Sequence, residues 1–493
     1  MRKSLFSLFF FLCLAMGFLL LSSFPALARQ EMNAEIPITT KSEKARQLYK
    51  DALDYLGNIK TAETQEALDK ALQLDPDFAA AHLLRAQVSG PDQQAFMKHY
   101  AKAVALKGNV SEGEQLLISI TQANVENKPQ EAFHALDKLV DLYPSDKYAH
   151  LINGQYAFNH HDVDKAITHF RKAVALDPSF GAGYNLLGYA YTRKGDYAKA
   201  EEAFRNYIKA EPDEANPYDS MADLLTKRGK HQEAIQNYQK AAALDPQFNV
   251  SLTKVGHNYL LMGQPEESRK AYQLAESKAT HYADKVDNIM ALAESYLYEG
   301  RYKEAMQTAS RGIKLLQQNK NIPYLAWAYL QQGEVYTQMN DLEKAKGSLA
   351  QLKALKASPG LTPHQKANFK NQQLFLEALI ATKAKDFAQA NAKAEELKTK
   401  LGANATVAQM MNYHKLMGII AFLQGDVQKS LSHLAQADQN NPRVLYYQSL
   451  AEAKAGNAEK AAQIEKKLNT LNEPSPEYAL VKASMVTSKM AVK

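Results

Sequence analysis

The sequence contains a single cysteine, Cys13, among 493 residues. A disulfide-stapled scaffold and a zinc site built from cysteines are therefore both excluded. The motifs of several enzyme classes are also absent, because no His-Glu-x-x-His, Gly-x-Ser-x-Gly or Gly-x-Gly-x-x-Gly sequence occurs, nor a glycine-rich phosphate loop with lysine. Apolar residues make up 46% and charged residues 23%, which excludes a disordered, collagen-like or multi-span membrane protein. We expect a globular, non-catalytic chain without a metal site or cofactor.

The N-terminal segment 1–28 has the pattern of a secretory signal peptide. Arg2 and Lys3 give a positive start, residues 5–21 form an apolar run, and residues 26–28 read Ala-Leu-Ala, a small-x-small cleavage site. Cleavage there predicts a periplasmic or secreted protein. The apolar run nearly reaches the ~20 residues of a membrane span, so a membrane anchor that is never cleaved is the alternative.

A regular repeat runs through the middle of the chain. It is marked by evenly spaced prolines at the ends of similar segments: Pro144, Pro178, Pro212 and Pro246. In the clearest unit, residues 183–212, two sets of residues recur at the spacing of one helix face, namely Tyr184, Leu187, Gly188 and Tyr191, then Ala200, Phe204 and Tyr207. Each unit is thus predicted to be two antiparallel helices joined by a tight turn.

This pattern resembles the tetratricopeptide repeat, which places an aromatic residue, Leu-Gly, Tyr, then Ala, Phe, Ala and Pro in a unit of about 34 residues. The small residue of the second helix falls on Ala132, Ala166, Ala200, Ala234 and Ser268, and then at longer intervals on Ala305, Ala345, Ala390, Ser430 and Ala461. The first-helix glycine falls on Gly154, Gly188 and Gly256, with Ala222 replacing it once. The resemblance covers nearly all of residues 42–470. It implies an all-α, right-handed superhelical solenoid of about eleven or twelve repeats.

The expected organisation follows from these patterns. A signal peptide (1–28) and a flexible leader (29–41) precede an N-terminal array (42–280) that is regular from about residue 112. A C-terminal array with longer repeats (281–473) and a capping tail (474–493) that covers the last apolar face complete the chain. Longer loops at 317–323 and 357–363 mark two places for a hinge.

In this family, partners lie along the concave surface that the first helices line. The resemblance carries that role onto Gln155, Phe158, Asn159, Asn185, Tyr189, Arg193, Asp219, Asp223, Lys227, Thr253, His257 and Leu261. Most of these side chains are polar or aromatic and are able to hydrogen-bond a peptide or flank a partner helix. We expect a protein–protein interaction scaffold that binds a protein or peptide outside the cytoplasm, although an ordinary solvated face has the same composition.

An alternative function is a small-molecule or polysaccharide-binding accessory protein of the cell envelope. Tyr324, Trp327 and Tyr329 suit stacking against sugars, but their spacing also fits packing within a first helix. The densest group of metal-ligating residue types is His160, His161, Asp162, Asp164 and His169. That group falls at the turn between two helices, where polar residues are expected anyway, so we predict no metal site there.

The net charge of +6 hides two unlike halves. Residues 29–300 carry 31 basic and 38 acidic residues, which gives −7, whereas residues 301–493 carry 26 and 15, which gives +11. The basic half is rich in lysine between residues 353 and 400, and this favours an acidic partner or an anionic surface with salt-sensitive binding. Nucleic acid is not expected as a partner of an exported protein, and membrane contact is expected only if the signal segment stays uncleaved.

Overall fold

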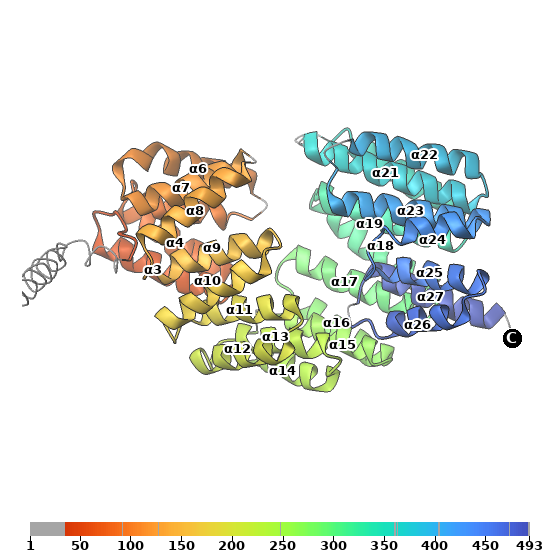
Figure 1. Ribbon diagram of the computed structural model, residues 1–493, viewed down its shortest axis with the longest axis horizontal. Helices are drawn as coiled ribbons and strands as arrows, with labels where there is room; N and C mark the ends of the chain where they lie inside the picture. The colour runs from red at the N-terminus through yellow and green to blue at the C-terminus, as the bar shows by residue number, and fades with distance from the viewer. Residues whose placement is uncertain are drawn as a thin grey trace, which may run out of the picture. The chain divides into compact units, whose positions relative to one another are not determined.

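The computed structural model describes residues 35–493, except 91, 127, 247, 359–360, 362, 403–404, 473 and 492–493. This described part of the chain consists of α-helices joined by short connections and contains no β-strand (Figure 1). The predicted all-α fold is confirmed. The predicted signal peptide, residues 1–28, lies outside the described residues.

The helices group into two compact units, of which the first ends at Leu224 and the second begins at Leu225. The boundary falls within α13 (Asn216–Lys227). The first unit contains α3 (Glu43–Gly57), α4 (Thr61–Leu74), α5 (Ala79–Gln87), α6 (Gln93–Leu106), the 3-10 turn η1 (Lys107–Asn109), α7 (Glu112–Val125), α8 (Pro129–Leu142), α9 (Lys147–Asn159), α10 (Val163–Leu176), α11 (Gly181–Lys194) and α12 (Tyr197–Ala210).

The second unit contains α14 (His231–Leu244), α15 (Val250–Leu261), α16 (Pro265–Lys278), α17 (Tyr282–Leu297), α18 (Tyr302–Gln318), α19 (Ile322–Gln338), α20 (Leu342–Leu355), α21 (Pro363–Lys383), α22 (Phe387–Leu401), α23 (Val407–Gln424), α24 (Val427–Leu434), α25 (Pro442–Lys454), α26 (Ala458–Asn469) and α27 (Pro476–Ala491). The unit boundary coincides neither with the change of repeat length at 280/281 nor with the loops at 317–323 and 357–363, so a hinge at those loops stays a prediction.

Within the units, consecutive helices form antiparallel pairs, from α3 with α4 to α11 with α12 and from α15 with α16 to α25 with α26, which makes eleven pairs in the described residues. This agrees with the expected number of repeats. All ten small residues of the second-helix pattern are buried: Ala132, Ala166, Ala200, Ala234, Ser268, Ala305, Ala345, Ala390, Ser430 and Ala461. The small-residue positions therefore mark helix contacts even where the repeat length changes.

Two of the close helix contacts place a glycine against an aromatic ring. A Cβ atom added to Gly188 in α11 would lie 2.5 Å from Cε1 of Phe204 in α12, and one on Gly256 in α15 would lie 2.4 Å from Cε1 of Tyr272 in α16. Both rings are fully buried. Only glycine lets the two helices approach this closely without displacing the ring.

Residues 35–41 lie in extended form against the first unit. The backbone N–H of Ile36 donates to Asp146 Oδ2 at 2.8 Å, and Thr39 donates to Glu114 Oε2 through both its N–H and its hydroxyl, at 3.0 and 2.6 Å. The Ile36 side chain joins the core cluster of α7, α8 and α9. These residues depart from the flexible leader predicted at 29–41, because carboxylates near helix starts accept their backbone donors.

The C-terminal helix α27 packs against α17, α19 and α25, which are the first helices of three different pairs in the second unit. Its Leu480 contacts the cluster around Leu297 and Val335, and its Tyr478 joins the cluster that contains Leu468 of α26. The tail therefore contains a helix, and its role as a cap on the last apolar face stays a prediction. Its apolar face also fills the space along the first helices.

Four charged side chains meet at the start of α27, one from α27 itself and one each from α19, α23 and α25. Arg443 in α25 pairs with Glu334 in α19 at 2.6 Å, and Lys415 in α23 pairs with Glu477 in α27 at 2.5 Å. Burial alone would raise the pKa of Glu477, but the positive charges of Arg443 and Lys415 outweigh it and hold the pKa at about 2. Since Arg443, Glu334 and Lys415 are buried, removing either partner of one ion pair leaves an uncompensated charge.

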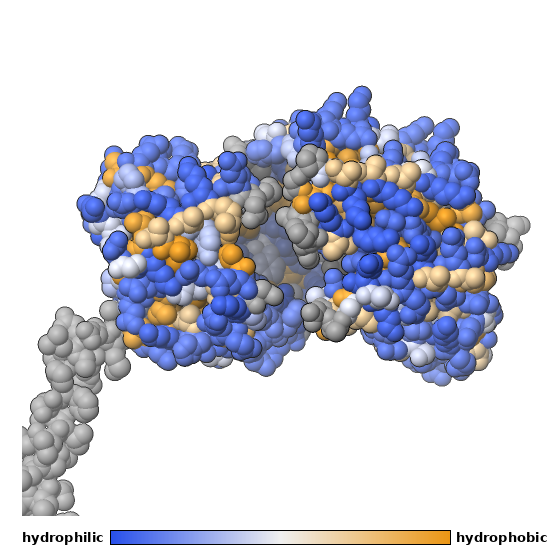
Figure 2. Space-filling view, turned by 90° about the horizontal axis from the view of Figure 1, so that it is seen from above, coloured by the Kyte–Doolittle hydropathy of each residue, from blue (hydrophilic) through white to orange (hydrophobic). Residues whose placement is uncertain are grey.

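The face of the molecule in Figure 2 is mostly hydrophilic, with apolar residues scattered in small groups. Scattered exposed apolar residues are normal for a folded protein. In the described part of the chain, no helix combines the length and apolar character needed to cross a membrane.

Three histidine pairs join the two helices of a repeat in the same manner. Their Nδ1 atoms lie 3.0 to 3.1 Å apart in His82–His99, His150–His169 and His414–His433. In the first two pairs, Nε2 of the first-helix histidine also lies 3.0 to 3.1 Å from a proline carbonyl oxygen, so Nε2 carries the proton and Nδ1 accepts from the second histidine. Burial lowers the pKa of all six rings, and brings those of His99 and His169 to about 4.

These histidines predict a pH-dependent stability. Because their pKa values in the folded chain lie below the ordinary value of about 6.5, the unfolded chain binds protons first, and stability is lost as the pH falls from about 7 towards 4. We expect the combined variant His99→Gln, His169→Gln and His433→Gln to flatten the loss between pH 7 and 5, by about 1 kcal/mol for each strongly shifted ring. Urea unfolding followed by circular dichroism at each pH measures it. His134→Gln, at an exposed site, is the control and should keep the wild-type slope, whereas an unchanged slope in the combined variant contradicts the prediction.

The glycine–ring contacts predict opposite effects of one substitution at two sites. Gly188→Ala forces a methyl group against the Phe204 ring and should lower the free energy of unfolding by about 1–3 kcal/mol. Gly347→Ala, in the exposed face of α20 with nothing within 4 Å of its added Cβ, should leave stability unchanged or raise it by up to about 1 kcal/mol. Thermal and urea unfolding of both variants test this, and equal effects would show that the close approach is not limiting.

Candidate functional site

Polar contacts link the first helices of successive pairs in the first unit. The guanidinium carbon of Arg193 in α11 lies 3.5 Å from the ring centre of Phe158 in α9, and its Nη1 donates to the Phe158 carbonyl at 2.7 Å. The Tyr189 hydroxyl in α11 donates to Asp223 Oδ2 at 2.8 Å. Burial, with the neighbouring Asp223 carboxylate, raises the pKa of Tyr189 far above its usual value, so the phenol keeps its proton for this bond.

Two of the predicted binding residues are buried rather than presented to solvent. Asn185 is 9% exposed and Asp219 is 4% exposed. The Asn185 amide oxygen accepts a hydrogen bond from the Ser220 hydroxyl at 2.9 Å. The Asn185 amide therefore links two neighbouring first helices, α11 and α13.

Four of the twelve predicted residues are exposed: Gln155, Asn159, Arg193 and Lys227. The first three belong to the first unit and Lys227 to the second. The twelve residues thus do not form one patch within either unit. Their part in partner binding stays a prediction.

The remaining predicted residues lie on α15 in the second unit. The Thr253 hydroxyl donates to Asn288 Oδ1 at 2.7 Å, and the His257 ring meets the Tyr272 ring edge-on at 5.5 Å between centroids. Burial lowers the pKa of His257 to about 4, so this ring is neutral at neutral pH. Leu261 packs into the apolar cluster that includes Tyr478 of α27. Thr253, His257 and Leu261 therefore take part in the internal packing of the second unit.

A cleft of about 550 Å³ opens in the first unit between the end of α3 and the starts of α9 and α11. Its polar lining comes from helix ends and turns: Asp54, Asn58, Lys147, Asp177, Ser179, Glu211, Asp213 and Glu214. The first pair meets the fifth pair at one side of the cleft, where Lys60 Nζ lies 2.6 Å from Glu214 Oε2 and the Tyr207 hydroxyl lies 3.2 Å from Asn58 Oδ1. These contacts fix the width of the cleft.

The charges of the cleft are partly compensated. Lys147 Nζ lies 2.7 Å from Asp177 Oδ2 and 4.6 Å from the centre of the Phe180 ring. Burial raises the pKa of Asp177, but hydrogen bonds from Lys147 and Ser179 outweigh it and hold the pKa at about 2. Asp177 is therefore ionised and already paired with Lys147.

Glu211 is the least satisfied carboxyl group of the cleft. Its Oε2 atom is buried without a hydrogen-bond partner. Burial raises the pKa of Glu211, and the neighbouring carboxylates of Glu214 and Asp54 raise it further. The cleft thus offers hydrogen-bond acceptors and excess negative charge.

The sequence did not single out this cleft, although part of the signal was present. The Asp-Pro and Glu-Pro steps at residues 177–178 and 211–212 place a carboxylate at the same point of successive repeats. The contribution of α3 could not be predicted from the sequence. It depends on how five helix pairs stack, which brings Asp54 and Asn58 close to the turns at residues 177–182 and 210–214.

The histidine-rich turn after α9 has a structural explanation. His161 has a φ of 66° and occupies the turn position that Gly195 holds in the next repeat, with a φ of 82°. Asp162 caps α10 as Asp196 caps α12, each by accepting from the N–H three residues on. Among the described residues, no three His, Cys, Asp or Glu side chains are placed to share a metal ion.

Comparison with known proteins agrees with the paired helices. Models of the tetratricopeptide repeat match residues 126–179, 152–220 and 185–248, and a second model of this repeat matches residues 327–355. No curated protein matches the sequence.

Several solved structures resemble parts of the chain. A tetratricopeptide repeat protein from Parabacteroides merdae is 13% identical over 56% of this chain and 94% of its own, with a TM-score of 0.34. PilF from Pseudomonas aeruginosa is 19% identical over 45% of this chain and 96% of its own, with a TM-score of 0.33. YrrB, described as a TPR protein with an unusual peptide-binding site, is 17% identical over 37% of this chain and 92% of its own, with a TM-score of 0.28. From the matched repeats and the paired helices, we identify the chain as a tetratricopeptide-repeat protein.

Proposed function

We propose that this protein is an exported, non-catalytic scaffold that binds a peptide segment of a protein partner in the cleft of the first unit. The cleft carries the proposal because it is an open volume of about 550 Å³ whose polar groups come from the end of α3, the start of α9 and the turns after α10 and α12. The exposed side chains of Gln155, Asn159 and Arg193 on α9 and α11 extend the polar surface of this unit. A peptide needs this combination of donors, acceptors and depth.

The first unit already accommodates one extended segment, its own residues 35–41. Carboxylates of Asp146 and Glu114 accept backbone N–H groups of this segment, at 2.8 and 3.0 Å. The carboxylates of the cleft lie at the C-terminal ends of helices and in the turns that follow, and Asp54 and Asp213 among them are exposed. We therefore expect a partner segment with N–H donors and basic side chains.

The cleft proposal predicts a loss of binding without a loss of fold. The full chain without its signal segment is used to capture proteins from an envelope extract, and the captured partner is then titrated. Asp54→Asn with Asp213→Asn should weaken binding at least tenfold, because it removes two exposed negative charges at the cleft.

The matched control is Glu131→Gln with Glu202→Gln, which removes two exposed carboxylates from the second helices α8 and α12. This control should bind like the wild type and both variants should unfold at the wild-type temperature. Equal capture by the cleft variant and the wild type would argue against the cleft as the binding site.

Export predicts a defined mature N-terminus. Cleavage after Ala28 leaves Arg29 as the first residue, seven positions before Ile36. N-terminal sequencing of protein recovered from the periplasm or medium should read Arg-Gln-Glu-Met. A chain that keeps residues 1–28 and sediments with membranes would favour the anchored alternative.

The basic half remains a candidate for an acidic partner. Several of its lysines already have carboxylate partners, since Lys353 and Lys393 lie 2.7 and 3.3 Å from Glu377, and Lys370 lies 3.0 Å from Glu396. The binding of an acidic protein or anionic surface by residues 301–493 therefore depends on the lysines beyond these pairs.

Small-molecule binding is a second candidate function, favoured by a cavity beside Trp327 in the second unit. Of the three aromatic residues considered for sugar stacking, Tyr329 is 4% exposed and its hydroxyl accepts from Gln317. The Tyr324 ring packs on Trp327, with 5.2 Å between ring centres, and its hydroxyl donates to Asp287. Trp327 alone of the three borders the cavity.

A further inference from the structure

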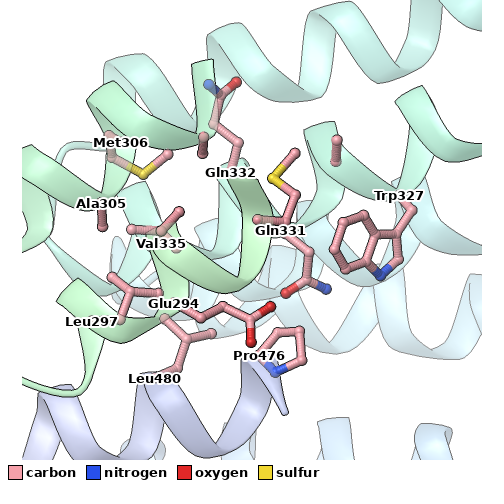
Figure 3. Close-up of a pocket in the computed structure, with 14 residues that line it drawn as sticks. Glu294, Leu297, Ala305, Met306, Trp327, Gln331, Gln332, Val335, Pro476 and Leu480 are labelled. Atoms are coloured by element: carbon pink, nitrogen blue, oxygen red, sulfur yellow. The ribbon is translucent and has the colours of Figure 1, made fainter. Parts of the chain in front are cut away.

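A cavity of about 50 Å³ lies in the second unit between α17, α18, α19 and the start of α27 (Figure 3). Its walls are largely apolar and include Met290, Leu297, Met306, Val335 and Leu480. A volume of this size has room for an organic group of a few heavy atoms. The cavity belongs to the second unit alone and does not depend on peptide binding by the first.

Glu294 of α17 is the one ionisable side chain among the described residues that line this cavity. Figure 3 shows its carboxyl group between Pro476 and the side-chain amide of Gln331, with the Trp327 ring beyond Gln331. Glu294 forms no ion pair with any described residue, and burial is the one influence that shifts its pKa. The apolar cavity thus holds one acidic group without a counter-charge.

The surroundings of Glu294 favour its neutral form when the cavity is empty. Burial raises the pKa of Glu294 to about 8. The titratable groups that interact with it are Tyr272 of α16, Tyr298 after α17 and Tyr324 of α19. Their own pKa values are raised, chiefly by burial, so these groups stay uncharged at neutral pH and do not balance a carboxylate.

We propose that this cavity binds a small alkylammonium ion, with the positive nitrogen at the Glu294 carboxylate and the hydrocarbon chain against Met290, Met306 and Val335. An ammonium ion supplies the charge that the carboxylate lacks, and their attraction is strong because the surroundings are apolar. The Gln331 amide oxygen and the Trp327 ring offer further contacts that a cation prefers. An anion would bring an uncompensated negative charge into the apolar cavity, and a neutral alcohol would gain no charge–charge attraction from Glu294.

The proposal couples binding to proton release. Below pH 8 the empty site holds a protonated carboxyl group, whereas the occupied site holds a carboxylate, so each bound ammonium ion displaces a proton. The affinity should therefore rise roughly tenfold per pH unit between pH 6 and 8 and then level off.

Isothermal titration calorimetry of the full-length chain without its signal segment tests the proposal with n-butylammonium, n-butanol and butyrate. We expect butylammonium to bind at least tenfold more tightly than butanol, and butyrate not to bind. Titration at pH 7 in two buffers with different heats of ionisation should show release of close to one proton.

Three variants separate the contributions. Glu294→Gln should abolish the preference for butylammonium and the proton release, and Ala309→Leu should fill the cavity and block every probe. Glu343→Gln, at an exposed carboxylate of α20, is the matched control and should behave as the wild type. Circular dichroism verifies that each variant is folded.

Two results would overturn the proposal. One is equal affinity for butylammonium and butanol that is unchanged in Glu294→Gln, which would make the cavity a purely apolar one. The other is the absence of binding of any probe at millimolar concentration, with the wild-type chain shown to be folded.

Discussion

The close approach of the two helices in the repeats of Gly188 and Gly256 depends on the absence of a side chain at one position. Gly188 and Gly256 leave space that the fully buried rings of Phe204 and Tyr272 occupy, and a single added carbon would overlap those rings. With this contact fixed, the second-helix small residue is buried in every repeat from Ala132 to Ala461. Each unit is therefore a stack in which a helix pair is completed by its neighbours.

Stacking brings first helices side by side, and the two units use that face differently. In the second unit, α27 covers α17, α19 and α25 with apolar side chains and is fixed at its start by Glu477. In the first unit, a polar cleft stays open between α3, α9 and α11. The first-helix face of the second unit is thus largely used for folding, whereas that of the first unit has room for a partner.

The repeat fold was predictable because its signals are local. The spacing of Gly188, Ala200 and Phe204 determines which residues pack, and this information lies within a single repeat. The candidate sites were not predictable, because they join distant repeats. Asp54 reaches the cleft only through the stacking of five pairs, and Pro476 reaches the Glu294 cavity only because α27 folds back on α17. Asn185 and Asp219 have the polarity of binding residues, yet both are buried in the first unit.

A comparison of Glu294 with Glu477, both in the second unit, shows that the Glu294 cavity lacks a positive charge. Burial raises the pKa of both Glu294 and Glu477, yet the pKa of Glu294 is about 8 and that of Glu477 is about 2. The difference arises because Arg443 and Lys415 lie beside Glu477, and Lys415 Nζ approaches it to 2.5 Å. Within the described residues, the carboxylate that anchors α27 is compensated, and Glu294, beside the start of the same helix, has no cation. A positive group that enters the cavity from outside would do for Glu294 what Lys415 does for Glu477. This contrast makes an external cation the natural complement of the site.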